Sequence, residues 1–118
     1  VGTMNKTRSP LAMAQSRLPR VLVILQGRPH PLPQDHRERQ ERIGAQIRTG
    51  RVSLLARAVR DLTWHQKLAH LTKIDTDNLR QGRDLLAAEM ALVSGDGVSD
   101  TVKLIEATIA DALASSPH

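Results

Sequence analysis

The sequence predicts an all-α protein, and three features lead to this fold class. Of the 118 residues, 40% are hydrophobic, yet there is no Tyr or Phe and only one Trp. A β-sandwich or barrel normally contains several aromatic side chains, whereas the abundant Leu, Ala, Arg and Gln favour helices. Apolar residues also recur at helical spacing between Gly and Pro residues. We therefore expect one compact bundle of about five helices with short connections.

The expected domain covers most of the chain. Residues 1–13 have no periodic pattern and are expected to be disordered or to form a linker, whereas residues 14–118 are expected to form a single domain. The longest apolar run, Val21–Leu25, is far shorter than a membrane span. Cysteine is absent, which excludes disulfides and thiolate metal sites. We expect a cytoplasmic protein without membrane contact.

The first predicted helix covers Gln15–Gln26, with apolar residues at helical spacing. Pro19 fits its first turn, where a missing N–H costs nothing, and Gly27 ends it. The next segment, Arg28–Pro33, has three prolines in six residues. Because proline fixes its own φ and restricts its predecessor, this segment is predicted to be an extended, stiff connector that holds the next helix at a set angle.

The second predicted helix covers Asp35–Thr49 and ends at Gly50. Asp35 is the expected N-cap, and Glu38 completes a pair that resembles a capping box. The apolar stripe is narrow, because only Ile43 and Ile47 contribute to it. This helix therefore has too little apolar surface to be buried on two sides.

Three further helices are predicted. The first covers Val52–Lys67, and the second runs from a cap at Thr72 to about Val93. The third covers Asp100–Ala114 and follows a cap at Ser99. Asp75 lies at the capping-box position relative to Thr72. Residues 94–97, with two glycines, form the expected turn before the last helix.

Charge is divided unevenly along the chain. The net formal charge is +5, but residues 1–60 carry +9 and residues 61–118 carry −4. All but one of the 12 basic residues in the first half are arginines. The arginine side chain offers a rigid fork of donors that suits phosphate, so nucleic acid is the first expected partner, with a solvated basic surface as the alternative.

The candidate site is the region around the second helix. Its free N–H groups and positive dipole end suit a phosphate group, and basic residues surround it. Glu38 and Glu41 on the same helix partly cancel this field. The candidate DNA-binding residues are His36, Arg37, Arg39, Arg42, Arg28 and Arg48.

Trp64, the only aromatic residue, has two interpretations. At helical spacing it projects roughly opposite the apolar face of the third helix, on the side of Arg57, Arg60 and Lys67. It could stack on bases or wedge into a minor groove. The favoured interpretation is that the indole covers a neighbouring helix or loop.

Motifs for catalysis and metal binding are absent from the sequence. It has no HExxH, no GxxxxGK[ST] loop and no GxSxG elbow. His65 and His70 are five residues apart, which turns them away from each other on a helix. The turn at Gly95–Gly97 lacks the ligand set of a calcium loop. We expect no enzymatic activity, no metal and no cofactor.

Several motifs resemble one known family. They are Pro31-Leu-Pro33 before the arginine-rich helix, Ala56-Arg-Ala-Val-Arg-Asp-Leu62, Leu71-Thr72, Ala87-Ala-Glu-Met-Ala-Leu92 and Gly97-Val-Ser99. In this order and spacing, from Pro31 to Leu113, the chain resembles the C-terminal helical domain of the CarD/CdnL family of bacterial transcription regulators.

The resemblance implies a DNA-contacting domain of a regulator that associates with RNA polymerase. In that family an N-terminal Tudor-like domain, which these 118 residues are not expected to include, binds the polymerase β subunit. The helical domain then contacts promoter DNA at the upstream edge of the transcription bubble. A family tryptophan wedges into the minor groove at the position that is His36 here, and phosphate-contacting residues fall at 37–42. Trp64 is not at the wedge position.

Two functions thus follow from the sequence. The first is a DNA-contacting, non-enzymatic domain that binds double-stranded promoter DNA largely through phosphates and localises to the nucleoid. The alternative is a helical interaction domain whose basic half docks an acidic protein. A pull-down with and without competing duplex DNA distinguishes these two functions, because DNA competes only in the first.

Overall fold

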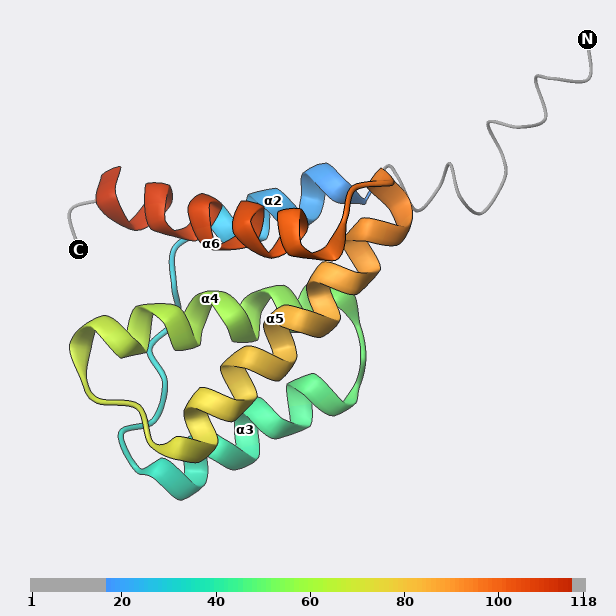
Figure 1. Ribbon diagram of the computed structural model, residues 1–118. Helices are drawn as coiled ribbons and strands as arrows, with labels where there is room; N and C mark the ends of the chain where they lie inside the picture. The colour runs from blue at the N-terminus through green and yellow to red at the C-terminus, as the bar shows by residue number, and fades with distance from the viewer. Residues whose placement is uncertain (1–16, 116–118) are drawn as a thin grey trace, which may run out of the picture.

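In the computed structural model, residues 17–115 are described, and they form five helices joined by short segments (Figure 1). The helices are α2 (Leu18–Gln26), α3 (His36–Arg48), α4 (Val52–Leu68), α5 (Lys73–Ser94) and α6 (Val98–Ser115). No strand occurs within this range, so the all-α prediction is confirmed. The expected linker at 1–13 and the first residues of the predicted first helix lie outside the described residues.

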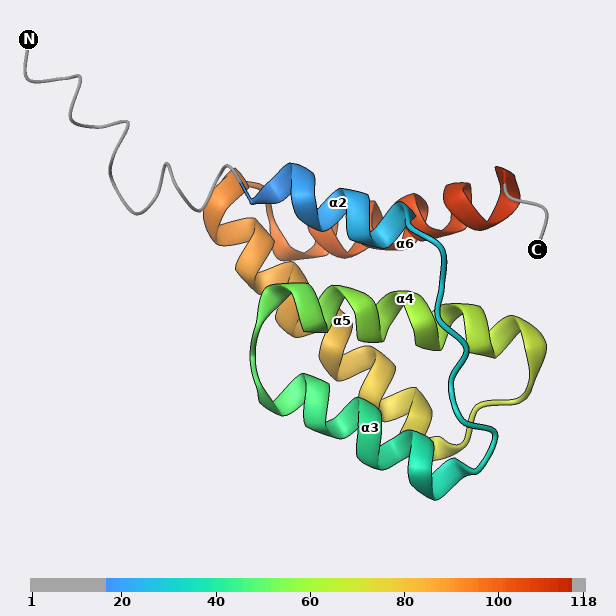
Figure 2. The same cartoon turned by 180° about the vertical axis from the view of Figure 1, so that it is seen from behind.

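The helices surround α4, which contacts each of the other four. α5 and α6 lie on the side that faces the viewer in Figure 1, whereas α2, the connector and α3 lie on the opposite side (Figure 2). Apolar residues from all five helices meet in one core. Its most deeply buried large side chains are Leu25, Ile43, Leu55, Leu62, Leu86, Ile105 and Ile109.

The connector at residues 28–33 has no helix or strand, as its prolines predict, and it runs across the outer side of α4 (Figure 2). It is attached to α4 by a buried carboxylate, because Asp61 Oδ1 accepts the His30 backbone N–H at 2.9 Å. The same oxygen accepts a bond of 2.9 Å from Arg60 Nε. Arg60 Nη1 also donates to the carbonyl of Ile24 at the end of α2. Prolines stiffen this segment, and Asp61 fixes where it lies.

Local chemistry explains most helix ends. Pro19 occupies the first turn of α2, as predicted. Thr72 and Asp75 form the predicted capping box with both reciprocal bonds. Gly95 ends α5 in the left-handed conformation, at φ 83°, which glycine adopts without steric cost.

The start of α6 corrects one prediction. Ser99 lies inside the helix, not at its cap, because α6 begins at Val98. The carbonyl of Gly97 already accepts the Thr101 backbone N–H at 3.0 Å and the Thr101 hydroxyl at 2.9 Å. The first helical hydrogen bond therefore starts two residues earlier than the serine suggested.

Gly82 lies where α5 crosses α3 and α4. A Cβ added to this buried residue would lie 3.4 Å from Val59 Cγ2 and 3.6 Å from Ile47 Cδ1, which are ordinary contacts. We expect Gly82→Ala to raise the free energy of unfolding by about 0.5–1 kcal/mol, because alanine favours the helix. Gly82→Leu should lower it by about 1–3 kcal/mol, because the larger side chain overpacks the crossing. Urea denaturation of both variants measures this, and equal losses would contradict it.

Candidate nucleic-acid interface

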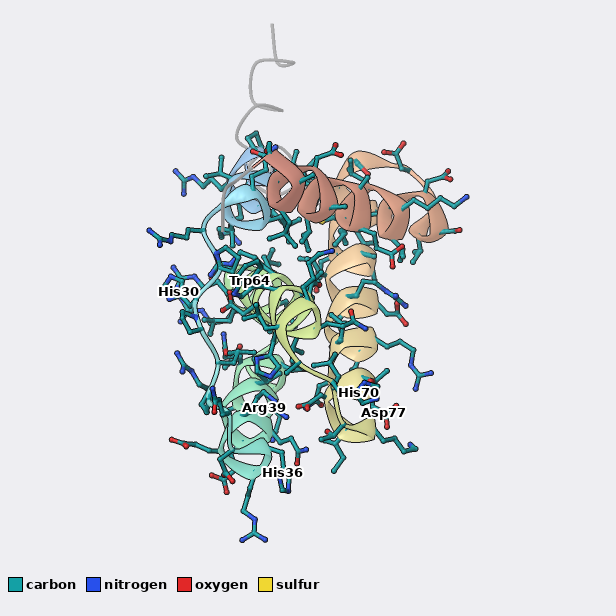
Figure 3. All side chains as sticks on the ribbon, turned by 90° about the vertical axis from the view of Figure 1, so that its left-hand side faces the viewer. His30, His36, Arg39, Trp64, His70 and Asp77 are labelled. Carbon is teal, nitrogen blue, oxygen red and sulfur yellow. The ribbon has the colours of Figure 1, made fainter. Side chains whose placement is uncertain are left out.

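The N-terminus of α3 is set by its cap. Asp35 Oδ2 accepts the backbone N–H of Glu38 at 2.9 Å, so the Asp35 cap is confirmed. His36 and Arg37 follow in the first turn, and both are exposed. In Figure 3, His36 lies at the tip of α3, away from the body of the bundle.

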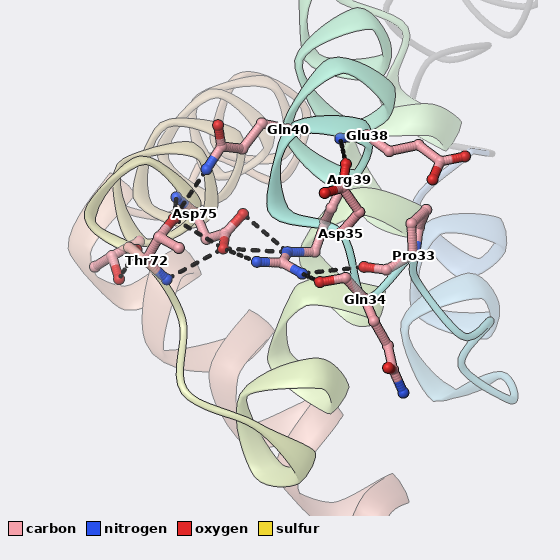
Figure 4. A network of polar contacts seen from close by, with 9 residues as sticks. Pro33, Gln34, Asp35, Glu38, Arg39, Gln40, Thr72 and Asp75 are labelled. Atoms are coloured by element: carbon pink, nitrogen blue, oxygen red, sulfur yellow. Dashed lines mark hydrogen bonds and ion pairs between the residues drawn. The ribbon is translucent and has the colours of Figure 1, made fainter.

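Arg39 is the centre of a buried polar network (Figure 4). Its Nη2 lies 2.6 Å from Asp75 Oδ2, and its Nε donates to both carboxylate oxygens at 3.1 Å. Its Nη1 donates to the carbonyls of Pro33 and Gln34 at 3.0 and 3.1 Å. One guanidinium thus ties α3 to the start of α5, to the last residue of the connector and to the residue that follows it.

The capping box of α5 belongs to the same network. Asp75 Oδ2 accepts the backbone N–H of Thr72 at 3.1 Å and its hydroxyl at 2.9 Å. Gln40 Nε2 donates to Thr72 Oγ1 at 3.0 Å. Within residues 17–115, every buried side-chain nitrogen and oxygen has a hydrogen-bond partner. The network is therefore fully satisfied, which is the condition for a buried polar group to be stable.

The pKa values of two residues in or near this network are lowered. Burial opposes ionisation of Asp75, but bonds from Arg39 and Thr72 and the Arg39 charge outweigh it, so the Asp75 pKa lies below its ordinary value. The pKa of the nearby buried His65 is also lowered, first by burial and then by the positive charge of Arg39, which outweigh the opposing effect of Asp75. Both shifts keep Arg39 paired and His65 neutral near pH 7.

The expectation that Arg39 lies on the exposed surface is wrong. The residue is only 3% exposed, and a carboxylate from the acidic half of the chain neutralises it. The helical period gives the reason: residue 39 precedes Ile43 by four positions and so lies on the buried face. That spacing, together with the capping acid Asp75, is a signal that the sequence did contain.

The other candidate residues remain on the surface. His36, Arg37, Arg42, Arg48 and Arg28 are all exposed. Within residues 17–115, none of these five forms an ion pair.

The exposed arginines of α3 lie on two flanks. At about 100° per residue, Arg37 and Arg48 project within about 20° of each other. Arg42 projects on the other flank, next to Arg39. Glu38 and Glu41 lie between the flanks, so the arginines form two separate positive edges.

Trp64 lies beside the connector (Figure 3). It is half-buried and, together with residues 28–31, lines a hollow of about 490 Å³ that includes Arg28 and His30. This place agrees with the favoured packing interpretation. Arg60, four residues before Trp64 on α4, is itself buried and donates to Asp61 and to the carbonyl of Ile24.

Charge is segregated between the two sides of the bundle. Most exposed arginines lie in or next to α2, the connector, α3 and the first half of α4, whereas most exposed acids lie on α5 and α6. The acids of α5 and α6 that form ion pairs do so mainly with Lys73, Arg80 and Arg83 of α5 itself. Asp75 is the exception among the described residues, since it neutralises Arg39. The acidic half therefore leaves most arginines of the basic half uncompensated.

A comparison with protein families supports the resemblance in the sequence. A profile of the CarD C-terminal domain matches residues 20–106, about three quarters of the chain. The chain belongs to the CarD C-terminal domain family. A comparison with curated proteins gives no match. Membership in this family of transcription regulators makes the chain a CarD-like, transcription-related domain.

The matched region of this CarD domain begins in α2 and ends in α6, so it includes the connector and the whole Arg39 network. Among residues 17–115 of the CarD domain, no helix is long and apolar enough to span a membrane. No group of three His, Asp or Glu side chains in this range could hold a metal ion.

Proposed function

We propose that this CarD-like domain contacts double-stranded promoter DNA through phosphate groups on its basic side. The observation that carries the proposal is that His36, Arg37, Arg42, Arg48 and Arg28 are exposed and form no ion pair within residues 17–115. Arg39 is left out of the proposed contact set, because Asp75 and two backbone carbonyls take up its donors. Arg39 instead holds the N-terminal end of α3 against the start of α5.

Phosphate contact fits the chemistry of this surface. Exposed guanidinium groups keep their charge at all relevant pH values and release counterions when they bind phosphates. The first turn of α3 adds backbone N–H groups and the positive end of the helix dipole. Glu38 and Glu41 lie between the two arginine edges and would repel a phosphate that lies directly across them. The affinity is therefore expected to be modest, sensitive to salt and largely independent of base sequence.

His36 occupies the position of the family's wedge tryptophan, and it is exposed at the tip of α3 (Figure 3). An imidazole is smaller than an indole and more strongly hydrated. We assign it a contact with the DNA backbone and not a wedge between base pairs.

The family also supplies the wider setting of the proposal. In CarD/CdnL regulators a separate domain binds RNA polymerase, and the helical domain contacts DNA next to it. For this chain we propose the same setting, in a bacterial cell at the nucleoid. Its effect on transcription then depends on that polymerase contact.

Fluorescence anisotropy with promoter-length duplex DNA at about 50 mM salt tests the proposal. We expect Arg37→Glu with Arg42→Glu to lower the affinity by about tenfold or more and to make the salt slope shallower by about 2, roughly 0.9 per lost phosphate contact. Glu41→Gln should strengthen binding, because it removes a negative charge between the two arginine edges.

The matched control is Arg80→Glu with Lys103→Glu, which changes the net charge equally on exposed residues of α5 and α6. This control should leave the affinity nearly unchanged. Absence of binding by the unaltered chain, or equal losses in both double variants, would show that the α3 arginines do not form a DNA contact.

A further inference from the structure

A groove between α2 and the start of α4 is lined by none of the proposed DNA contacts, although Arg48 lies three residues before its Arg51. It has a volume of about 610 Å³. Three exposed arginines line it: Arg17 just before α2, Arg20 in α2, and Arg51 in the turn before α4. None of them forms an ion pair within the described part of the chain.

The floor of this groove is apolar. Val21, Ile24 and Val52 line it below the arginines. A smaller pit of about 90 Å³ adjoins the groove and shares Arg17, Val21, Val52 and Glu89 with it. The pit is completed by aliphatic residues and a methionine, namely Leu18, Met90 and Val93.

The electrostatics of the groove favour an anionic partner. Among the described residues that line the groove and the pit, Glu89 is the one carboxylate, against three arginines. α4 begins here with no side-chain cap and no acidic residue in its first turn, so its positive dipole end faces no compensating charge of its own. The groove therefore combines three arginines and one carboxylate with apolar lining residues and one largely apolar pit.

We propose that this groove binds an acidic peptide segment of a partner protein, which inserts one aliphatic side chain into the pit. Carboxylates on either side of that side chain meet Arg17, Arg20 and Arg51. This interaction does not rest on the DNA contacts proposed for α3, because the two sets of residues do not overlap.

Two other occupants fit less well. Duplex DNA matches the arginines, but its phosphate backbone offers no aliphatic side chain for the pit. Residues 1–16 of this chain contain Lys6 and Arg8 and no acidic residue, so their charge repels the arginines of the groove. An acidic segment with an aliphatic anchor satisfies both the charge and the shape of the groove.

The test uses the full chain and a fluorescein-labelled peptide in which Glu and Asp residues surround one leucine. We expect saturable binding, which weakens by about fivefold or more when serine replaces the leucine, because the apolar anchor is lost. Arg20→Glu with Arg51→Glu should lower the affinity by about tenfold or more, because two attractive contacts become repulsive.

A second variant separates binding from folding. Val52→Asp places a carboxylate at the edge of the pit, while aspartate in the first turn of a helix favours that helix. It should abolish peptide binding and leave the circular dichroism spectrum unchanged. Glu89→Gln should strengthen binding, and Lys103→Glu on α6 should have no effect.

Three results would overturn the proposal. The first is an equal affinity for the leucine and serine peptides, which would reduce the groove to a charged surface. The second is a loss of DNA affinity in the Arg20/Arg51 variant as large as its loss of peptide affinity, which would assign the groove to nucleic acid. The third is self-association of the chain that Arg51→Glu abolishes, which would assign it to a second copy. None of these results bears on the α3 arginines.

Discussion

Asp75→Asn is expected to lower the free energy of unfolding by about 3–5 kcal/mol, a large part of the stability of a domain of this size. The substitution leaves the guanidinium of Arg39 buried, with carbonyl groups as its main partners and no negative charge to compensate it. Breaking one side of a buried ion pair costs more than the pair contributes, because the remaining charge loses its compensation. Guanidinium denaturation followed by circular dichroism measures this loss.

Two further variants make the experiment specific. Asp77→Asn removes the partner of Lys73 and Arg80 on the exposed side of α5, and it should cost less than about 1 kcal/mol. Arg39→Met combined with Asp75→Asn should be more stable than Asp75→Asn alone, since it removes the uncompensated charge. If the double variant is the less stable one, the cost comes from the capping box and not from the ion pair.

The same pair gives stability a defined dependence on pH. Because the pKa of Asp75 is lowered in the folded state, its contribution is fully present above the ordinary value near 3.8. The contribution is lost as the pH falls through the lower folded pKa. The difference in stability between the unaltered chain and Asp75→Asn should therefore shrink below about pH 4. A constant difference down to pH 2 would contradict this account.

The sequence predicted the elements of the fold well, because helix starts and ends carry local signals. Pro19, the Thr72–Asp75 capping box and Gly95 all lie where the patterns placed them. The misplaced cap at Ser99 shows the limit of such signals, since a serine near a helix start competes with a glycine carbonyl that begins the helix earlier. The residue at which such a helix begins therefore depends on the backbone conformation and not on residue type.

The candidate site was harder to predict, because the charge pattern does not show which arginine faces inward. Arg39 and Arg42 are two arginines of one helix, yet Arg39, on the face of Ile43, is buried against Asp75, whereas Arg42 is exposed. Arg39 and its partner Asp75 lie 36 residues apart in the chain. Only the packing of α3 against α5 brings such groups together. The groove beside α2 was missed for the same reason, since its arginines come from separate segments.

Asp61→Ala is expected to lower the free energy of unfolding by about 3 kcal/mol and to release the connector from α4. Asp61 Oδ1 is the shared acceptor of the His30 backbone N–H and of the buried Arg60. Without it, Arg60 retains the carbonyl of Ile24 but no buried carboxylate. The His30 amide should lose its protection against hydrogen exchange, whereas amides in the middle of α3 should stay protected.

The only tryptophan in the chain reports on this release directly. Trp64 lies half-buried beside the connector, so its fluorescence emission should shift to longer wavelength in Asp61→Ala as the indole becomes hydrated. Asp84→Asn, which removes an exposed partner of Arg83, is the matched control and should change neither emission nor stability by a measurable amount. An unshifted emission in Asp61→Ala would mean that the prolines alone hold the connector in place. A shifted emission with protected α3 amides would show that the two ends of the connector are held independently, by Asp61 at His30 and by Arg39 at Pro33 and Gln34.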